Sequence, residues 1–193
     1  METTVPSELR DFLASLPMAL ALASIEGDHP LLFVNERFSE LTGYSGDDVI
    51  GRNCRFLQGD TRDGQAHAKF RAFLHNDDTM SARAPIINFR RDGSAFVNLL
   101  YLTRLRAESG ETRYILGSQF DVSRVEVERL QAYDRDLARA LTGLGPLSVG
   151  CGIAIDDALA VIGDSVRPQG AGRTPPGLSP RLACWRSSSR TAP

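Results

Sequence analysis

The sequence has few cysteines, no long apolar run and no strong excess of charge of either sign. Its three cysteines are too few and too irregularly spaced for a disulfide framework or a zinc cluster. A formal net charge of −2 gives no electrostatic reason to expect nucleic acid. No stretch approaches the length that crosses a bilayer, and the first ten residues lack the basic-then-apolar order of a secretion signal. These absences predict a soluble, cytoplasmic protein without a metal site, a membrane span or a nucleic-acid partner.

Signatures of enzymes are also missing. No paired carboxylates and no Ser/His/Asp set are recognisable, and His29, His67 and His75 are scattered along the chain. We therefore expect no enzymatic activity. The composition, 193 residues of which 42% are hydrophobic, suits one well-cored domain with additions, or two very small domains.

Short apolar runs separated by turn residues predict an antiparallel sheet. The runs 18–25 and 31–34 flank a Gly- and Pro-containing turn and are typical of a hairpin. Helical pieces punctuated by glycines follow over 36–74. Three further strand-like runs come next: 83–90, 95–105 and 113–122. This order of elements predicts an α+β fold, with a sheet whose helices gather on one face.

Amphipathic helices are expected on both sides of this core. Residues 5–16 carry apolar side chains at helical spacing, and 123–141 has one apolar stripe among many charges. The segment from 165 onward has no acidic residue and several prolines, which is typical of a disordered tail. The chain thus divides into a cap helix at 1–16, a core at 17–122, a C-terminal helix at 123–143, a further short helix at 144–164 and a tail at 165–193.

Three amide side chains fall on one face of the predicted sheet. Because side chains alternate across a strand, Asn88, Asn98 and Gln119 share a mostly apolar face. Buried amides need hydrogen-bond partners, and each offers both a donor and an acceptor. The three could satisfy one another or loop backbone, but their grouping favours a heterocyclic ligand. The opposite face is too apolar to meet water, so the flanking helices or a second subunit should cover it.

One segment carries a family resemblance. Residues 51–58, GRNCRFLQ, resemble the GxNCRFLQ signature of LOV domains, which are FMN-binding blue-light sensors of the PAS superfamily. The resemblance extends over 17–122 and includes Asn35, the Thr42-Gly43-Tyr44 turn and the motif at 88–93. It implies the PAS fold: a five-stranded antiparallel sheet with short helices on one face, flanked by N- and C-terminal helices.

The resemblance also implies the roles of individual residues. Cys54 matches the photoactive cysteine, which bonds reversibly to the flavin carbon C4a after illumination. The other matches contact FMN: Arg55 and Arg71 at the phosphate, Asn53 and Gln58 at the ribityl chain and ring edge, Asn88 and Asn98 at the pyrimidine edge, Gln119 near C4=O and N5, with Leu57 and Leu100. The planar fork of arginine suits a phosphate. Gln119 could answer a protonation change at N5 by rotating its amide.

Three positions, one charged pair and one apolar residue, depart from the family pattern but keep its chemistry. Asp48 and Arg91 stand where the family usually has glutamate and lysine, and they preserve the signs of a surface ion pair. Val97 replaces a frequent tryptophan, at a position that the alternation places on the outward face. Flavin binding should survive both changes, while helix or subunit packing differs.

No recognisable effector signature follows residue 122. The flanking helices themselves are therefore expected to carry the signal, by altering a homodimer formed through these helices and the outer sheet face, or by exposing a surface to an unknown downstream protein. Two other functions remain open. One is a redox-sensing flavoprotein that keeps FMN without using Cys54, and the other is a flavin-free PAS interaction module in which Cys54 is an ordinary buried thiol.

Overall fold

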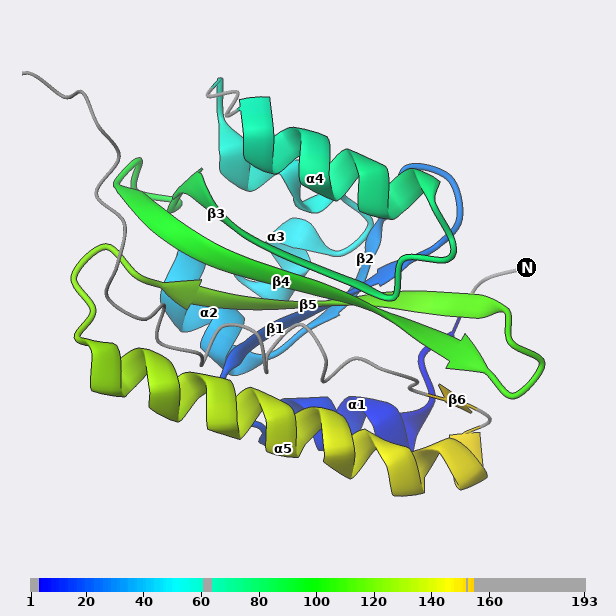
Figure 1. Cartoon of the computed structure of the whole chain (residues 1–193). Coiled ribbons are helices and arrows are strands. Elements are labelled where there is room, and N and C mark those ends of the chain that lie inside the picture. The colour runs from blue at the N-terminus through cyan, green and yellow to red at the C-terminus, as the bar shows by residue number, and fades with distance from the viewer. Residues whose placement is uncertain (1–3, 61–63, 152, 155–193) are drawn as a thin grey trace, which may run out of the picture.

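One antiparallel sheet organises the chain and carries helices on both faces (Figure 1). The structure is a computed structural model that describes residues 4–60, 64–151 and 153–154. The main strands are β1 (Ala19–Ser24), β2 (Leu31–Val34), β3 (Ser81–Phe89), β4 (Ala95–Ala107) and β5 (Thr112–Asp121). Their spatial order is β2-β1-β5-β4-β3, with every pair antiparallel. The last of these five strands, β5, therefore lies in the middle of the sheet. The predicted α+β fold class is confirmed.

Short helices cover the inner face of the sheet. They are α2 (Glu36–Thr42), α3 (Gly46–Val49), the 3-10 helix η1 (Cys54–Gln58) and α4 (Gly64–His75). Asn35 starts α2, because its Oδ1 accepts from the backbone N–H of Phe38 at 3.1 Å. The same amide also bonds the backbone of Leu20 and Met18, at 2.9 and 2.8 Å, and so ties this helix to β1. Gly43, at φ +76°, ends α2 in the left-handed conformation that glycine adopts without strain.

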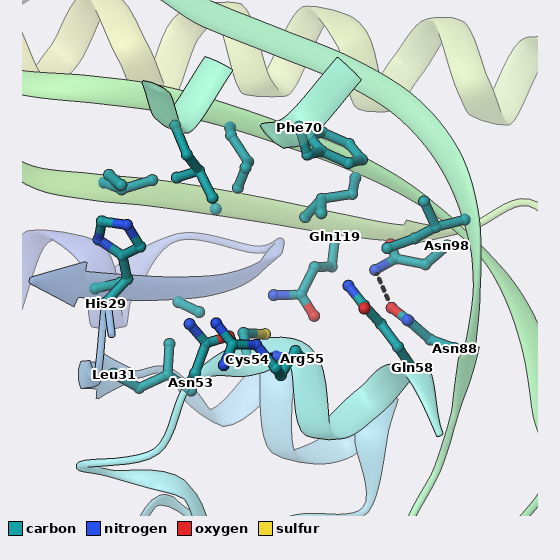
Figure 2. A pocket seen from close by; sticks show the side chains of 18 residues that line it. His29, Leu31, Asn53, Cys54, Arg55, Gln58, Phe70, Asn88, Asn98 and Gln119 are labelled. Carbon is teal, nitrogen blue, oxygen red and sulfur yellow. Dashed lines mark hydrogen bonds between the residues drawn. The ribbon is translucent and has the colours of Figure 1, made fainter. Parts of the chain in front are cut away.

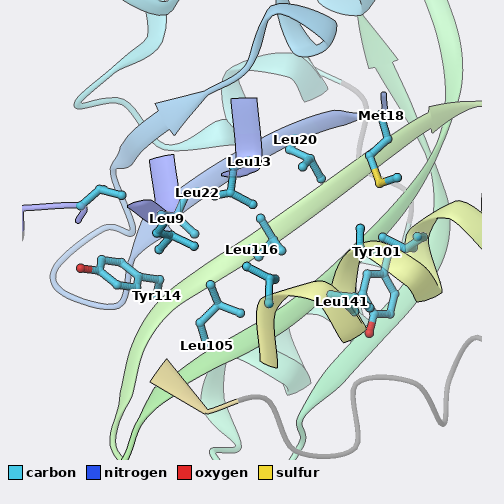
Figure 3. Close-up of a cluster of buried hydrophobic side chains, with 14 of the residues drawn as sticks. Leu9, Leu13, Met18, Leu20, Leu22, Tyr101, Leu105, Tyr114, Leu116 and Leu141 are labelled. Carbon is cyan, nitrogen blue, oxygen red and sulfur yellow. The ribbon is translucent and has the colours of Figure 1, made fainter. Parts of the chain in front are cut away.

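The outer face is covered by α1 (Ser7–Ser15) and α5 (Val127–Cys151), as the sequence predicts. Figure 3 shows the apolar layer between them and the sheet. Its fully buried members include Leu9 and Leu13 of α1, Leu22 of β1, Leu105 of β4 and Tyr114 of β5. Burying each such side chain contributes roughly 1.5–3 kcal/mol, which makes this layer the main core of the described chain.

The bounds of the C-terminal helix differ from the prediction. Residues 123–126 are not helical, because the Ser123 hydroxyl accepts from the backbone N–H of Val97 at 2.8 Å and its own N–H donates to Asp121 at 2.9 Å. Helix α5 then continues through Gly143, where a Cβ would lie only 3.1 Å from Phe12 of α1. A glycine that looks like a stop signal in the sequence is thus a point of close helix packing.

The segment after residue 143 also corrects the prediction of a separate short helix. Residues 144–151 belong to α5, and the two-residue strand β6 (Ile153–Ala154) pairs with Arg106 and Ala107 of β4. The rest of the predicted 144–164 helix and the 165–193 tail lie outside the described residues. In the part of the chain that is described, no helix is long and apolar enough to span a bilayer.

Candidate functional site

A cavity lies between the inner face of the sheet and the helices η1 and α4 (Figure 2). Its volume is about 130 Å³, whereas roughly 10–15 Å³ is enough for one water. Its walls are mostly apolar, with a few convergent polar groups, as is usual for small-molecule sites. The lining residues are Ala21, Ala23, His29, Leu31, Asn53, Cys54, Arg55, Gln58, Phe70, Leu74, Ile86, Asn88, Asn98, Leu100, Leu102, Ile115, Gly117 and Gln119.

The sheet brings together the three amides that the sequence places on one face. Asn98 donates through Nδ2 to Oδ1 of Asn88 at 2.8 Å, and its own Oδ1 accepts from the backbone N–H of Phe120 at 3.2 Å. Asn88 donates in turn to the carbonyl of Ile87 at 3.0 Å. These two amides thus partly satisfy one another and the backbone, as one of the two interpretations of the sequence expected.

Gln119 behaves differently. It is 2% exposed, and neither Oε1 nor Nε2 has a hydrogen-bond partner in the described part of the chain. Figure 2 shows its amide pointing toward the segment that carries Cys54 and Gln58. An unsatisfied buried polar atom costs about 1–3 kcal/mol, so this amide is suited to a bound group that both donates and accepts.

Three small residues lie on the sheet side of the cavity: Ala21 and Ala23 of β1 and Gly117 of β5. A Cβ added at Gly117 would lie 3.3 Å from Leu102 Cδ2 and 3.7 Å from the carbonyl oxygen of Ala21. Any larger residue at this position of β5 would therefore push against its neighbours or fill the cavity. An apolar wall that also carries hydrogen-bonding amides suits an apolar heterocycle with a polar edge.

Cys54 is the first residue of η1, and Asn53 positions it. The Asn53 side chain accepts from the backbone N–H of Arg55 at 2.9 Å and donates to the carbonyl of Asp28. Cys54 is partly exposed as a residue, but burial of its thiol raises the pKa to about 12. The sulfur consequently stays protonated at neutral pH and is a poor nucleophile without further activation.

The two arginines of the predicted phosphate site are placed differently. Arg55 lines the cavity, yet its guanidinium forms a forked ion pair with Asp28, with N–O distances of 2.8 and 2.6 Å. Arg71 lies exposed on α4 and is not among the lining residues. Leu57 is likewise absent from the lining and packs in the cluster that contains Phe38 and Val49. The FMN contacts expected of Arg71 and Leu57 remain predictions.

Several lining residues were not singled out from the sequence. The most informative is His29, which lies in the β1–β2 turn and has a positive φ of 52°. A backbone bridge between Pro30 and Asn53 brings this turn beside η1. No local pattern signals that contact, because it joins residues more than twenty positions apart. Among the described residues, no three His, Cys, Asp or Glu side chains form a group that could hold a metal ion.

Comparison with known proteins relates the chain to PAS domains and to blue-light receptors. A sequence model of the family described as PAS domain matches residues 17–124. Blue-light-activated histidine kinase 2 of Erythrobacter litoralis is 38% identical over 125 residues, which cover 64% of this chain and 36% of the kinase. The chain also matches phototropin-2 of Oryza sativa, with 37% identity over 121 residues, and it spans only 13% of the length of that protein.

Two solved structures of LOV proteins align with the structure of this chain. The LOV domain of the Erythrobacter litoralis EL346 blue-light activated histidine kinase aligns with 37% identity and a TM-score of 0.52, over 56% of this chain and 99% of that domain. The Rhodobacter sphaeroides LOV protein aligns with 25% identity and a TM-score of 0.69, over 82% of this chain and 90% of that one. The second alignment therefore extends well beyond the PAS core.

Proposed function

The chain belongs to the LOV branch of the PAS domain family, and on that premise we propose that it is a blue-light receptor that binds FMN and bonds Cys54 reversibly to the flavin carbon C4a. One observation carries the proposal. The cavity that contains Cys54 also contains a buried glutamine, Gln119, with both amide atoms unpartnered. A ring edge with adjacent donor and acceptor atoms would satisfy that amide.

The cavity residues suit the parts of FMN. The wall formed by Asn88, Asn98 and Gln119 would hold the polar ring edge, and Gly117 leaves room for the flat ring beside β5. Arg55 would exchange its exposed partner Asp28 for the phosphate, at little cost because exposed ion pairs contribute only about 0–1 kcal/mol. When bound, the flavin would supply the absorption of blue light and the carbon to which the sulfur bonds.

The state of Cys54 suits a switch that is silent in the dark. A thiol whose pKa is raised to about 12 is almost entirely neutral at physiological pH. It would therefore not attack an electrophilic carbon until light makes the reaction favourable. A thiolate held next to the same carbon would react without illumination.

The neighbours of Gln119 give a route from the cavity to α5. Gln119 faces the cavity, whereas Ser118 and Phe120 face the opposite side of β5, and both contact Tyr133 of α5. The Ser118 and Tyr133 hydroxyl oxygens are 2.6 Å apart, and the Phe120 and Tyr133 rings stack with centroids 4.3 Å apart. Rotation of the Gln119 amide would exchange its donor and acceptor, and so bias the position of α5 through the contacts of Ser118 and Phe120 with Tyr133.

The output is proposed to be a change in a homodimer or in a surface for a downstream protein. Helices α1 and α5 cover most of the outer face of the sheet, but Ile87 of β3 and Val97 of β4 remain 43% and 36% exposed. Val127, the first residue of α5, is 68% exposed. Ile87 and Val97 are paired across β3 and β4, and Ser123 bonds the Val97 N–H just before α5 begins. A second copy docking there would sense any movement at the start of α5. Identical scattering profiles in the dark and in the light would contradict a dimerisation switch.

The visible absorbance of the purified protein, before and after a blue flash, tests the function directly. We expect a structured blue band that bleaches and recovers in the dark, and a Cys54→Ala variant that keeps the band but does not bleach. A band that never bleaches in the unchanged protein would indicate a redox flavoprotein. The absence of any band would indicate a flavin-free interaction module.

A further inference from the structure

The lining of the cavity contains very few groups that exchange protons near neutral pH. Most lining side chains are apolar, and the polar ones are mainly amides, which do not titrate. Arginine is a residue type that keeps its proton under all ordinary conditions, and burial raises the pKa of Cys54 to about 12. His29 is the one described lining residue whose type changes charge between about pH 5 and 8.

The local structure holds the imidazole of His29 in a defined state. Its Nδ1 lies 3.2 Å from the carbonyl oxygen of Ser24, which can only accept a hydrogen bond. Nδ1 therefore carries the proton in the neutral ring, and Nε2 keeps a free electron pair. The residue also adopts a φ of 52°, in the left-handed region where histidine, like asparagine and aspartate, is several-fold enriched among residues other than glycine.

We propose that His29 is the proton carrier that returns Cys54 to its free thiol in the dark, an inference that rests on the proposed photoreceptor function. His29 Nε2 takes the proton that the flavin N5 gained in the light, directly or over one water. The electron pair of that N–H bond closes the C4a=N5 double bond, and Cys54 Sγ leaves with the pair of the Sγ–C4a bond. His29 then gives the proton to Sγ, so that no net oxidation or reduction occurs.

Among the described lining residues, His29 is the one histidine, and the groups around it are as follows. Helix η1 contributes Cys54, Arg55 and Gln58 to the cavity, α4 contributes the apolar Phe70 and Leu74, and the lining strands contribute apolar residues and amides. The other nearby imidazole, that of His67 on α4, lies outside the lining, with its Nε2 2.8 Å from Gln58 Oε1. Asp28, the neighbour of His29 in the turn, is paired with Arg55. Both carboxylate oxygens of Asp28 are engaged by the Arg55 guanidinium, at 2.8 and 2.6 Å, so this carboxylate is directed at Arg55.

The test is the rate of dark recovery after a blue flash, measured between about pH 5 and 8 for the unchanged protein and for His29→Asn. Asparagine tolerates a positive φ and keeps a donor for the Ser24 carbonyl, but it cannot carry the proton. In the unchanged protein we expect recovery to become faster as the pH rises and the ring loses its charge. In His29→Asn we expect recovery about 100-fold slower at the alkaline end, without that pH dependence.

A matched control is His75→Gln, which removes an exposed histidine at the end of α4, outside the cavity lining. It should keep the rate and pH profile of the unchanged protein. A His29→Asn rate within about threefold of the original, with the same profile, would overturn the inference but leave the photoreceptor proposal intact. A flat profile in the unchanged protein would do the same without any variant. Failure of the unchanged protein to bleach would overturn both.

A second measurement does not depend on the photocycle. Nitrogen-15 NMR of the histidine rings in flavin-free protein should show His29 with its proton on Nδ1 and an unprotonated Nε2 at alkaline pH. The opposite tautomer would place the proton on the nitrogen that must act as the base. That result would overturn the inference whatever the recovery rates.

Discussion

Replacing Gln119 by leucine is expected to stabilise the flavin-free protein, which is the reverse of what most core substitutions do. Gln119 is buried, and both of its amide atoms lack partners in the described part of the chain. Each unsatisfied atom costs about 1–3 kcal/mol, and leucine has neither. Allowing for imperfect packing of the branched side chain, we expect a gain of roughly 2 kcal/mol, which corresponds to a rise of about 4–8 °C in Tm for a domain of this size.

The assay is thermal unfolding, followed by circular dichroism, of flavin-free protein with and without added FMN. A ligand that binds only the folded state at about 100 times its Kd adds roughly 2.7 kcal/mol of stability. The Gln119→Leu variant should gain about 1 kcal/mol less from the same FMN concentration, because one net hydrogen bond is missing. The variant should thus be more stable than the original when empty and should gain less when loaded.

Asn98→Leu is the control with the opposite expectation. Its side chain bonds Asn88 and the backbone of Phe120, so leucine would leave both of those groups unpaired. We expect this variant to lose roughly 2 kcal/mol or more when flavin-free. If both leucine variants moved Tm in the same direction, the assignment of Gln119 as unsatisfied and Asn98 as satisfied would be refuted.

Two further predictions concern stability. Asp134→Ala should lower the free energy of unfolding in urea by about 3–5 kcal/mol, because it removes the carboxylate that pairs with Arg83 at 2.5 Å, and both side chains of this pair are under a tenth exposed. Arg91→Ala breaks the exposed pair with Asp48 at 2.8 Å and should cost no more than about 1 kcal/mol. Equal losses in the two variants would contradict this reasoning. Burial raises the pKa of Cys54 from 9.0 to about 12, so the unfolded chain ionises first. The stability contributed by the protonated thiol is therefore complete below about pH 9 and should be lost as the pH rises toward 12. The urea midpoints of the original protein and of Cys54→Ala should diverge in that window. Midpoints that change in parallel with pH would argue against a buried thiol.

The faces of the strands could be predicted from the sequence because their cause is local. Alternation depends only on the pleat, so Asn88, Asn98 and Gln119 fall on the cavity side as predicted, while Val97 faces outward. The ion pair between Asp48 and Arg91 also forms as expected. In each case the relevant information lies in a short segment or in a family motif.

The features that escaped prediction depend on contacts between distant segments. The pairing of Arg55 with Asp28 spans 27 positions, and that of Arg83 with Asp134 spans 51. Neither residue in such a pair differs in its local pattern from a solvated surface charge. His29 enters the cavity only because the β1–β2 turn folds against η1, which no periodicity in the sequence encodes.

The position of β5 restricts how a change at Gln119 can leave the cavity. The backbone of Gln119 is paired with Ala19 of β1 on one side and with Leu100 of β4 on the other. A sideways displacement would break ladder hydrogen bonds along both edges, so it is opposed by the whole sheet. Contacts perpendicular to the sheet have no such constraint, and Ser118 and Phe120 make two of them with Tyr133. We therefore expect a rearrangement of the Gln119 amide to be transmitted more readily to α5 than to the neighbouring strands.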